Sequence, residues 1–118
     1  MKIPSLILKQ LYTFGSLENT PQGVVFGLKN RLSDAVVTGI RRISVDGSPL
    51  DLDEVVLTVA GQEFAPKEVT SETPIALPLT KTMSVLWRGA SLDVGKHTIA
   101  FDFESTPFGK LSFEVKDA

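Results

Sequence analysis

The chain has 118 residues, with 12 lysines and arginines against 14 aspartates and glutamates, and a formal net charge of −2 at pH 7. A chain of this length forms one domain with its own core, so we expect a single domain over residues 1–118. The sequence contains no cysteine, which excludes a disulfide framework, a thiolate metal site and a cysteine nucleophile. It also lacks the basic excess that nucleic-acid binding draws on for its contacts to phosphates.

The N-terminal segment, MKIPSLILKQLY, carries an apolar run that Pro4 and Lys9 interrupt. No small-residue cleavage site follows this run, so we expect neither a signal peptide nor a membrane span. The default expectation is a cytoplasmic protein. Residues 6–17 are expected to form the first strand or pair of strands, with a bend near Gly15.

Alternation between apolar and polar residues, the pattern of a half-buried β-strand, recurs along the middle of the chain. In residues 24–32, one face carries Val24, Phe26, Leu28 and Leu32, and the other carries Lys29 and Arg31. The same kind of pattern predicts strands over residues 35–47, 54–61, 62–64 and 82–89.

The clearest alternation lies at the C-terminal end of the chain. Residues 97–105 and 110–117 each place an aliphatic or aromatic side chain at every second position. The link between them, Thr-Pro-Phe-Gly, consists mainly of turn residues, so the two segments should pair as an antiparallel hairpin.

These segments amount to about seven to nine short strands separated by turns, a pattern typical of an all-β fold. We predict an antiparallel β-sandwich, jelly-roll-like, with at most a short helical turn. Residues 49–55 and 65–72 are the two candidates for that turn. Residues 65–81 form the longest irregular stretch, and a long loop in a compact domain is a place to look for function.

Four cations, Lys29, Arg31, Arg41 and Arg42, crowd into a short part of the chain. Lys29 and Arg31 occupy the solvated face of a predicted strand and need no further explanation. Arg41 and Arg42 are adjacent, so a regular strand would turn them to opposite faces, and one would need a carboxylate partner or a path to the rim. Two roles stay open, a solvated or edge-protecting role and a protein interface. Arg31, Arg41 and Arg42 are therefore interface candidates.

The two signs of charge are unevenly spread along the chain. Residues 46–72 carry seven acids against one lysine, whereas the cations of residues 29–42 face only Asp34. Opposite-signed patches on one small domain suit self-association or docking on a partner.

His97 is the only histidine, and it lies at the first position of the strand predicted over residues 97–105. We expect a structural role, with the ring bonded to backbone or water. The alternative is a small enzyme in which His97 acts as a general base with a carboxylate such as Asp93 or Asp102.

Trp87 is in phase with Met83 and Val85, which favours packing in the core. The alternative is a carbohydrate-binding module in which Trp87, Tyr12 or Phe14 stacks on a sugar ring.

Asp51, Asp53 and Glu54 form a short acidic run. The run offers too few oxygen ligands for a calcium ion, so a solvated turn is expected. With one histidine and no cysteine, the chain is expected to hold no metal and no cofactor of its own.

Four motifs follow one another in the middle of the chain: Gly-hydrophobic-x-Phe-x-hydrophobic-Lys at 23–29, Val-Asp-Gly at 45–47, an acidic segment at 51–54 and Gly-x-x-Phe at 61–64. Together they resemble the small β subunit of the C-glycoside deglycosidases. The later segment DVGKHTIAFDF is similar to another strand of that family.

The resemblance implies a jelly-roll-like sandwich that associates with a larger TIM-barrel subunit, which holds a divalent metal and the catalytic residues. It therefore implies a non-catalytic accessory subunit. The residues themselves leave a second interpretation open: a stand-alone carbohydrate- or ligand-binding sandwich that forms a homo-oligomer.

Overall fold

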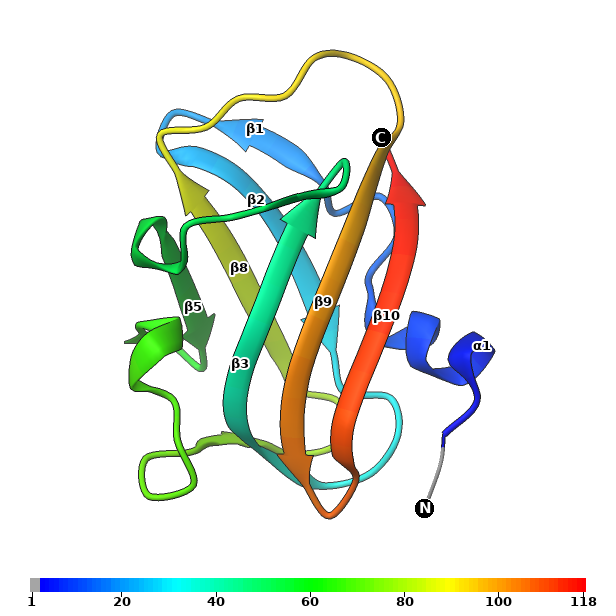
Figure 1. Ribbon diagram of the computed structural model, residues 1–118, viewed down its shortest axis with the longest axis vertical. Coiled ribbons are helices and arrows are strands. Elements are labelled where there is room, and N and C mark those ends of the chain that lie inside the picture. Colours follow the sequence, from blue (N-terminus) through cyan, green and yellow to red (C-terminus); the bar gives the residue numbers. More distant parts are fainter. Residues whose placement is uncertain (1–2) are drawn as a thin grey trace.

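The computed structural model describes residues 3–118, in which ten strands form two antiparallel sheets packed face to face (Figure 1). Sheet A, with the order β1-β2-β8-β5-β6, contains β1 (Glu18–Thr20), β2 (Gly23–Lys29), β8 (Thr82–Arg88), β5 (Val55–Val59) and β6 (Gln62–Phe64). Sheet B, with the order β10-β9-β3-β4 and β7 paired to β3, contains β10 (Gly109–Asp117), β9 (His97–Thr106), β3 (Ala35–Val45), β4 (Ser48–Pro49) and β7 (Ile75–Leu77). The predicted antiparallel β-sandwich is confirmed; the short strands β1, β4 and β7 add to the predicted set.

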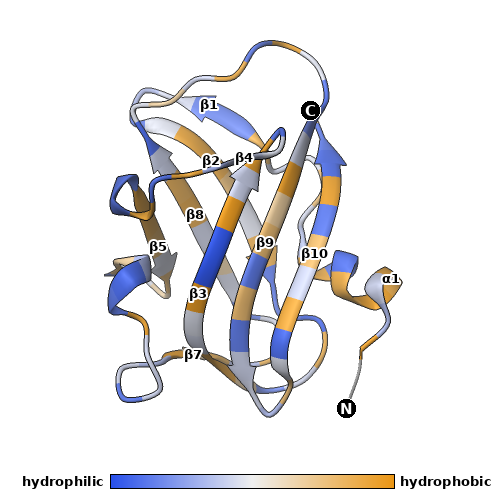
Figure 2. Cartoon of the chain, viewed as in Figure 1, coloured by the Kyte–Doolittle hydropathy of each residue, from blue (hydrophilic) through white to orange (hydrophobic). Residues whose placement is uncertain are grey.

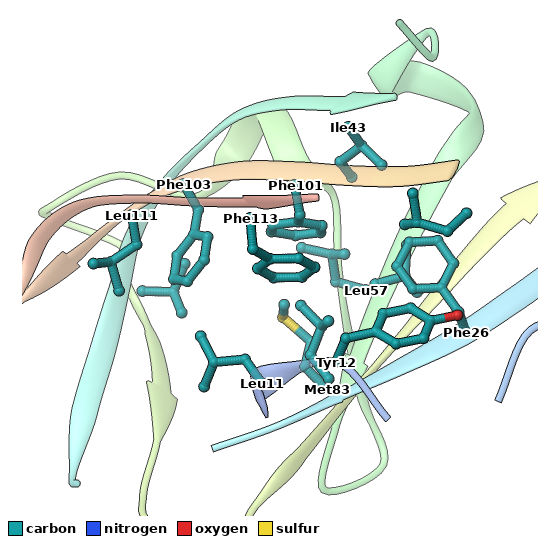
Figure 3. Packing of buried hydrophobic residues seen from close by; sticks show 14 of the residues in the cluster. Leu11, Tyr12, Phe26, Ile43, Leu57, Met83, Phe101, Phe103, Leu111 and Phe113 are labelled. Carbon is teal, nitrogen blue, oxygen red and sulfur yellow. The ribbon is translucent and has the colours of Figure 1, made fainter. Parts of the chain in front are cut away.

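The core lies between the sheets and is built from alternate residues of each strand. Phe101 of β9 is fully buried, and Phe113 of β10 stacks on it with ring centroids 6.0 Å apart. Sheet A supplies the facing side chains, among them Phe26 and Leu57 (Figure 3). The alternation is visible as hydrophobic and hydrophilic bands along the strands (Figure 2). Burial of each such side chain contributes roughly 1.5–3 kcal/mol, so these positions fix which face of each sheet turns inward.

The C-terminal hairpin forms as predicted. Strands β9 and β10 pair antiparallel along their length, from Ser105 opposite Gly109 to His97 opposite Asp117. This pairing brings the end of the chain beside the first residue of β9.

The sequence predicts at most one short helical turn, and each of its two candidate segments contains a single 3-10 turn, η2 (Leu52–Glu54) and η3 (Pro66–Glu68). Asp51 caps η2, because its carboxylate accepts a hydrogen bond from the backbone N–H of Asp53 at 3.0 Å. This is the role that an acidic residue before a helical turn predicts.

The N-terminal segment is helical rather than extended, so the strand prediction for residues 6–17 is wrong. It forms α1 (Ser5–Leu8) and the 3-10 turn η1 (Lys9–Leu11). The buried side chains are Leu8, Leu11 and Tyr12, which follow the i, i+3, i+4 spacing of a helix face. Beyond them, Tyr12 reaches sheet A through a single bridge to Leu28.

Strand β3 carries a bulge at the arginine pair. Its register against β9 shifts between Ile40 and Arg42, so Arg41 is an extra residue in the strand. As a result, both Arg41 and Arg42 are exposed, while Ile43 is fully buried. The prediction that the two arginines point to opposite faces is wrong, because the bulge breaks the alternation between them.

Much of the stretch 65–81 belongs to the scaffold. It contains η3 and β7, and Ile75 of β7 is fully buried. Asn30, which is only 3% exposed, donates from Nδ2 to the carbonyl oxygens of Ser33 and Leu77 at 2.7 and 2.6 Å. A buried amide with its donors satisfied holds this stretch against the end of β2.

Gly23 provides a test of the close approach between β2 and β8. It has a φ of +146°, and a Cβ added there would lie 2.1 Å from the carbonyl oxygen of Trp87. We expect Gly23→Ala to destabilise the fold by about 2–4 kcal/mol, because backbone of β8 would have to move. Urea unfolding measures the change.

Gly27 is the matched control in the same strand. A Cβ there would meet nothing closer than 3.9 Å, so Gly27→Ala should change the free energy of unfolding by less than about 1 kcal/mol. Equal effects of the two substitutions would contradict the steric explanation.

Candidate functional site

His97 lies where the start of β9 meets the β3–β4 turn and the loop that precedes β9. Its Nδ1 is 2.7 Å from Oδ2 of Asp46, and its Nε2 is 2.7 Å from the carbonyl oxygen of Asp93. Both neighbours are acceptors, so the site favours the protonated ring, in which both nitrogens donate. The His97 side chain is 13% exposed. We call His97, Asp46 and the Asp93 carbonyl the His97 latch.

The latch shifts the pKa of both charged partners. The hydrogen bond to Asp46, followed by that to the Asp93 carbonyl, raises the pKa of His97. The hydrogen bond from His97, followed by that from the backbone N–H of Thr98 at 2.9 Å, lowers the pKa of Asp46. Each side chain therefore stabilises the charged form of the other.

The geometry gives the latch a holding role. A general base needs a free nitrogen to take a proton from substrate, and here each ring nitrogen already faces an acceptor. The loop before β9 has a second attachment: Asn19 donates to the carbonyl oxygen of Leu92 and accepts from its N–H, both at 2.9 Å. The latch and Asn19 together fix this loop against β3, β9 and β1.

The predicted carboxylate partners of His97 are not the ones that the structure uses. Asp93 contributes its backbone oxygen, and Asp102 lies on the outer face of β9, where it accepts a hydrogen bond from Ser112. Sequence reasoning missed Asp46, which follows β3 and is brought to His97 by the pairing of β3 with β9. The available signal was the Val-Asp-Gly turn, but only a known register would have linked it to His97.

A second polar contact, also not predicted, joins the two ends of the described chain. The Tyr12 hydroxyl donates to Oδ2 of Asp117 at 2.7 Å, and the backbone N–H groups of Gly15 and Leu17 donate to the same carboxylate. Burial raises the pKa of Asp117, but hydrogen bonds from Tyr12, Ala118, Gly15 and Leu17 outweigh it and leave that pKa lowered. Burial, then the bond to Asp117, raises the pKa of Tyr12.

Arg31, one of the interface candidates, is exposed but engaged. Its guanidinium donates to the carbonyl oxygen of Gln10 at 2.5 Å and reaches Oγ1 of Thr13 at 3.4 Å. Arg31 therefore holds the N-terminal segment beside β2. Lys29, the last residue of β2, is half-buried.

The other two arginines lie on the outer face of sheet B. Arg41 pairs with Glu104 at 2.8 Å, with side chains 51% and 37% exposed. A pair this exposed contributes at most about 1 kcal/mol. Arg42 is exposed and donates from Nε to the hydroxyl of Ser44 at 3.1 Å.

Arg42 borders a hollow of about 240 Å³ on that outer face. The hollow has a floor of small residues and a rim of charged and hydroxyl groups. Its lining residues are Arg42, Ser44, Gly47, Thr98, Ala100, Asp102 and Glu114.

The aromatic candidates for sugar stacking take different places. Trp87 is partly buried and packs against the core, and Tyr12 is 1% exposed. Phe14 is 59% exposed, with its ring edge-on to Tyr12 at a centroid distance of 5.3 Å. Of the three, Phe14 is the one that presents a ring to solvent.

The acidic run serves local structure. Asp51 caps η2, and Asp53 pairs with Lys67 at 3.0 Å. Within residues 3–118, no three histidine or carboxylate side chains come together as a group that could hold a metal ion.

These features define a small antiparallel β-sandwich domain whose main polar clusters hold its own strands and loops. Residues 7–118 match the family described as hydroxymethylglutaryl-CoA reductase, N-terminal domain. Because the match covers nearly the whole chain, the chain belongs to that family. Comparison with curated proteins gave no match. The resemblance to the C-glycoside deglycosidase small subunit stays a prediction.

In the part of the chain that the structure describes, no helix is long and apolar enough to cross a membrane.

The latch predicts a defined pH dependence of stability. The raised pKa of His97 means that its contribution is fully present below the ordinary value of 6.5 and is lost as the pH rises through the raised value. The lowered pKa of Asp46 means that its contribution is present above the ordinary 3.8 and is lost as the pH falls through the lowered value. The latch should therefore stabilise most between pH 3.8 and 6.5.

We expect His97→Gln to lower the free energy of unfolding most within that range, and by less at alkaline pH. Urea unfolding of both proteins at a mildly acidic and an alkaline pH measures the difference. Lys96→Gln is the control, since it removes a neighbouring charge that makes no contact in the latch. A deficit in His97→Gln that does not change with pH would contradict the imidazolium assignment.

Proposed function

We propose that this chain is a non-catalytic accessory β-sandwich that assembles with the catalytic part of a larger enzyme. The observation that carries the proposal is the family match over residues 7–118, which takes in the whole sandwich. The family description refers to one domain of a reductase, at its N-terminus. A domain of this kind accompanies a catalytic domain, so we take assembly, rather than a reaction, as its function.

The polar clusters support this proposal. In the His97 latch and around Asp117, the titratable groups bind loops and chain ends of the domain itself. Such contacts make a rigid scaffold, which is what a docking domain needs, because a preformed surface loses little freedom on binding.

The outer face of sheet B is the surface that we propose for the enzyme partner. Arg42 is the favoured interface residue, because Arg41 already pairs with Glu104 whereas Arg42 makes one hydrogen bond to Ser44 and borders the hollow. A guanidinium binds carboxylates in a two-pronged geometry. We therefore expect the partner to insert an acidic side chain into the hollow.

Two classes of partner fit the proposal. The family description points to the remainder of a hydroxymethylglutaryl-CoA reductase. The resemblance seen in the sequence points instead to a TIM-barrel subunit that holds a divalent metal. In both cases the chemistry belongs to the partner, and we propose the cytoplasm as the setting.

Affinity purification tests the proposal. The tagged chain is passed through lysate of its source organism, and the retained proteins are identified by mass spectrometry and assayed. We expect stoichiometric recovery of an enzyme of one of the two classes, and its identity decides between them. Recovery of this chain alone, under conditions where it is folded, would overturn the accessory role.

Arg42→Ala tests the surface. It should weaken binding to the recovered enzyme by at least about tenfold, as expected for an arginine anchor at an interface. Lys67→Ala is the matched control, since Lys67 is also an exposed cation with a single polar contact, to Asp53. If both variants bind like the wild type, the enzyme docks elsewhere.

A second candidate function is binding of a small polar ligand, such as a sugar, in the same hollow. The observation that favours it is the ring of hydrogen-bonding groups, Arg42, Asp102 and Glu114 among them, around about 240 Å³. Calorimetric titration with monosaccharides would detect it, and Ala100→Trp, which fills the floor, should abolish the heat. A flat titration would remove this candidate for sugars.

A further inference from the structure

The turn between β3 and β4 contains the only Asp-Gly pair of the sequence, Asp46-Gly47. Val45 and Ser48 pair on either side of it, and both turn residues have a positive φ, 53° for Asp46 and 82° for Gly47. These are the residues and the backbone angles of a two-residue hairpin turn. The turn lies at the end of the sandwich where β9 begins (Figure 1).

An Asp-Gly pair can rearrange chemically. The backbone nitrogen of Gly47 attacks Cγ of Asp46, a C–N bond forms, the nitrogen loses its proton, and one carboxyl oxygen leaves as water. The product is a succinimide ring. Water then opens the ring at either carbonyl and gives aspartate again or isoaspartate, in which the main chain runs through the side-chain carbon. Glycine hinders the attack least, because it has no Cβ beside the nitrogen.

The Gly47 side of the turn does not oppose this reaction. Asp46 and Gly47 are both exposed, and a Cβ added at Gly47 would meet no atom within 4 Å. Within residues 3–118, the N–H of Gly47 donates no hydrogen bond to another backbone group. Protection of this turn must therefore come from the Asp46 carboxylate.

The Asp46 carboxylate is held at both oxygens. Its Oδ2 is 2.7 Å from Nδ1 of His97, and its Oδ1 accepts a hydrogen bond from the N–H of Thr98 at 2.9 Å. Both partners are residues of β9, so the carboxylate is bound to the neighbouring strand. These bonds resist the rotation of the carboxyl group that attack by the adjacent nitrogen requires.

The same bonds oppose the loss of water. An oxygen leaves as water only from a protonated carboxyl group, and an ionised carboxylate must first take up a proton. The hydrogen bond from His97, followed by that from Thr98, lowers the pKa of Asp46. Both requirements of the reaction, a free carboxyl group and a protonated one, are therefore opposed by contacts to β9.

We propose that the His97 latch protects the Asp46-Gly47 bond from isomerisation to isoaspartate. Isoaspartate would lengthen the main chain of the turn by one carbon and break the latch. Gly47 also lines the hollow on the outer face of sheet B, so the reaction would alter the surface that we propose for the enzyme partner. The inference does not depend on that partner, because the chemistry lies within the turn.

Prolonged incubation at mildly acidic pH tests the proposal. After digestion, liquid chromatography with mass spectrometry separates and counts the aspartate and isoaspartate forms of the peptide that contains Asp46. We expect His97→Gln to form isoaspartate at least about tenfold faster than the wild type, the factor that loss of a hydrogen bond to a charged group produces. Lys96→Gln is the matched control and should react like the wild type.

Two results of that comparison would overturn the proposal. Equal rates in the wild type and His97→Gln would show that the hairpin protects the turn without the latch. A slower rate in His97→Gln would show the opposite role, in which the protonated ring of His97 gives a proton to the leaving oxygen and promotes the reaction.

Urea separates loss of the latch from loss of overall stability. If His97→Gln reacted only through unfolded molecules, its rate would rise with urea in proportion to the unfolded fraction, which circular dichroism measures. We expect instead a rate that stays constant below the unfolding transition, because the reaction needs only a released carboxylate in the folded domain. A rate that follows the unfolded fraction would overturn the assignment of protection to the latch.

Discussion

The pairing of β3 with β9 is the contact on which the rest of the structure depends. These are the two longest strands, and β9 pairs on its other side with β10, so they form the centre of sheet B. Their register buries Ile43 beside Phe101 on the inner face. The same register carries Asp46, the residue that follows β3, to the start of β9. The His97 latch is thus a consequence of the sheet, and a shift of one residue would destroy the core and the latch together.

Polar contacts hold the N-terminal segment, most of which lies outside the two sheets. The carboxylate of Asp117, in the last residue of β10, gathers the Tyr12 hydroxyl and two N–H groups of the segment that follows it. Arg31 holds the same segment from the side of β2. The N-terminal segment buries Leu8, Leu11 and Tyr12, and these hydrogen bonds add to that apolar contact in holding the segment in place. The sequence marks a histidine and a cluster of cations as possible sites. In the structure, His97, Arg31 and Arg41 bind other parts of the same domain.

The sequence predicts the sandwich well and its polar sites poorly, for physical reasons. Alternation locates the long strands because each has one buried face, as residues 97–105 and 110–117 illustrate. It fails for residues 6–17, where a short apolar run fits a helix face as well as a strand and tertiary packing decides. It fails at Arg41, because a bulge depends on how the strand meets its partner. The link between Asp46 and His97 could not be predicted either, since it spans 51 positions and exists only in the paired sheet.

The two outer faces follow from the same alternation and differ in what they can bind. On sheet B the outward positions of β3, β9 and β10 are filled mainly by charged and hydroxyl residues, which hydrate well and attract a partner through specific pairs. On sheet A the central outward positions hold Val25, Leu86 and Val56, which gain free energy when water is removed. Each of the three is only partly exposed, because neighbouring side chains on the sheet cover it. Valine also favours the extended backbone, so these residues stabilise the central strands of sheet A themselves.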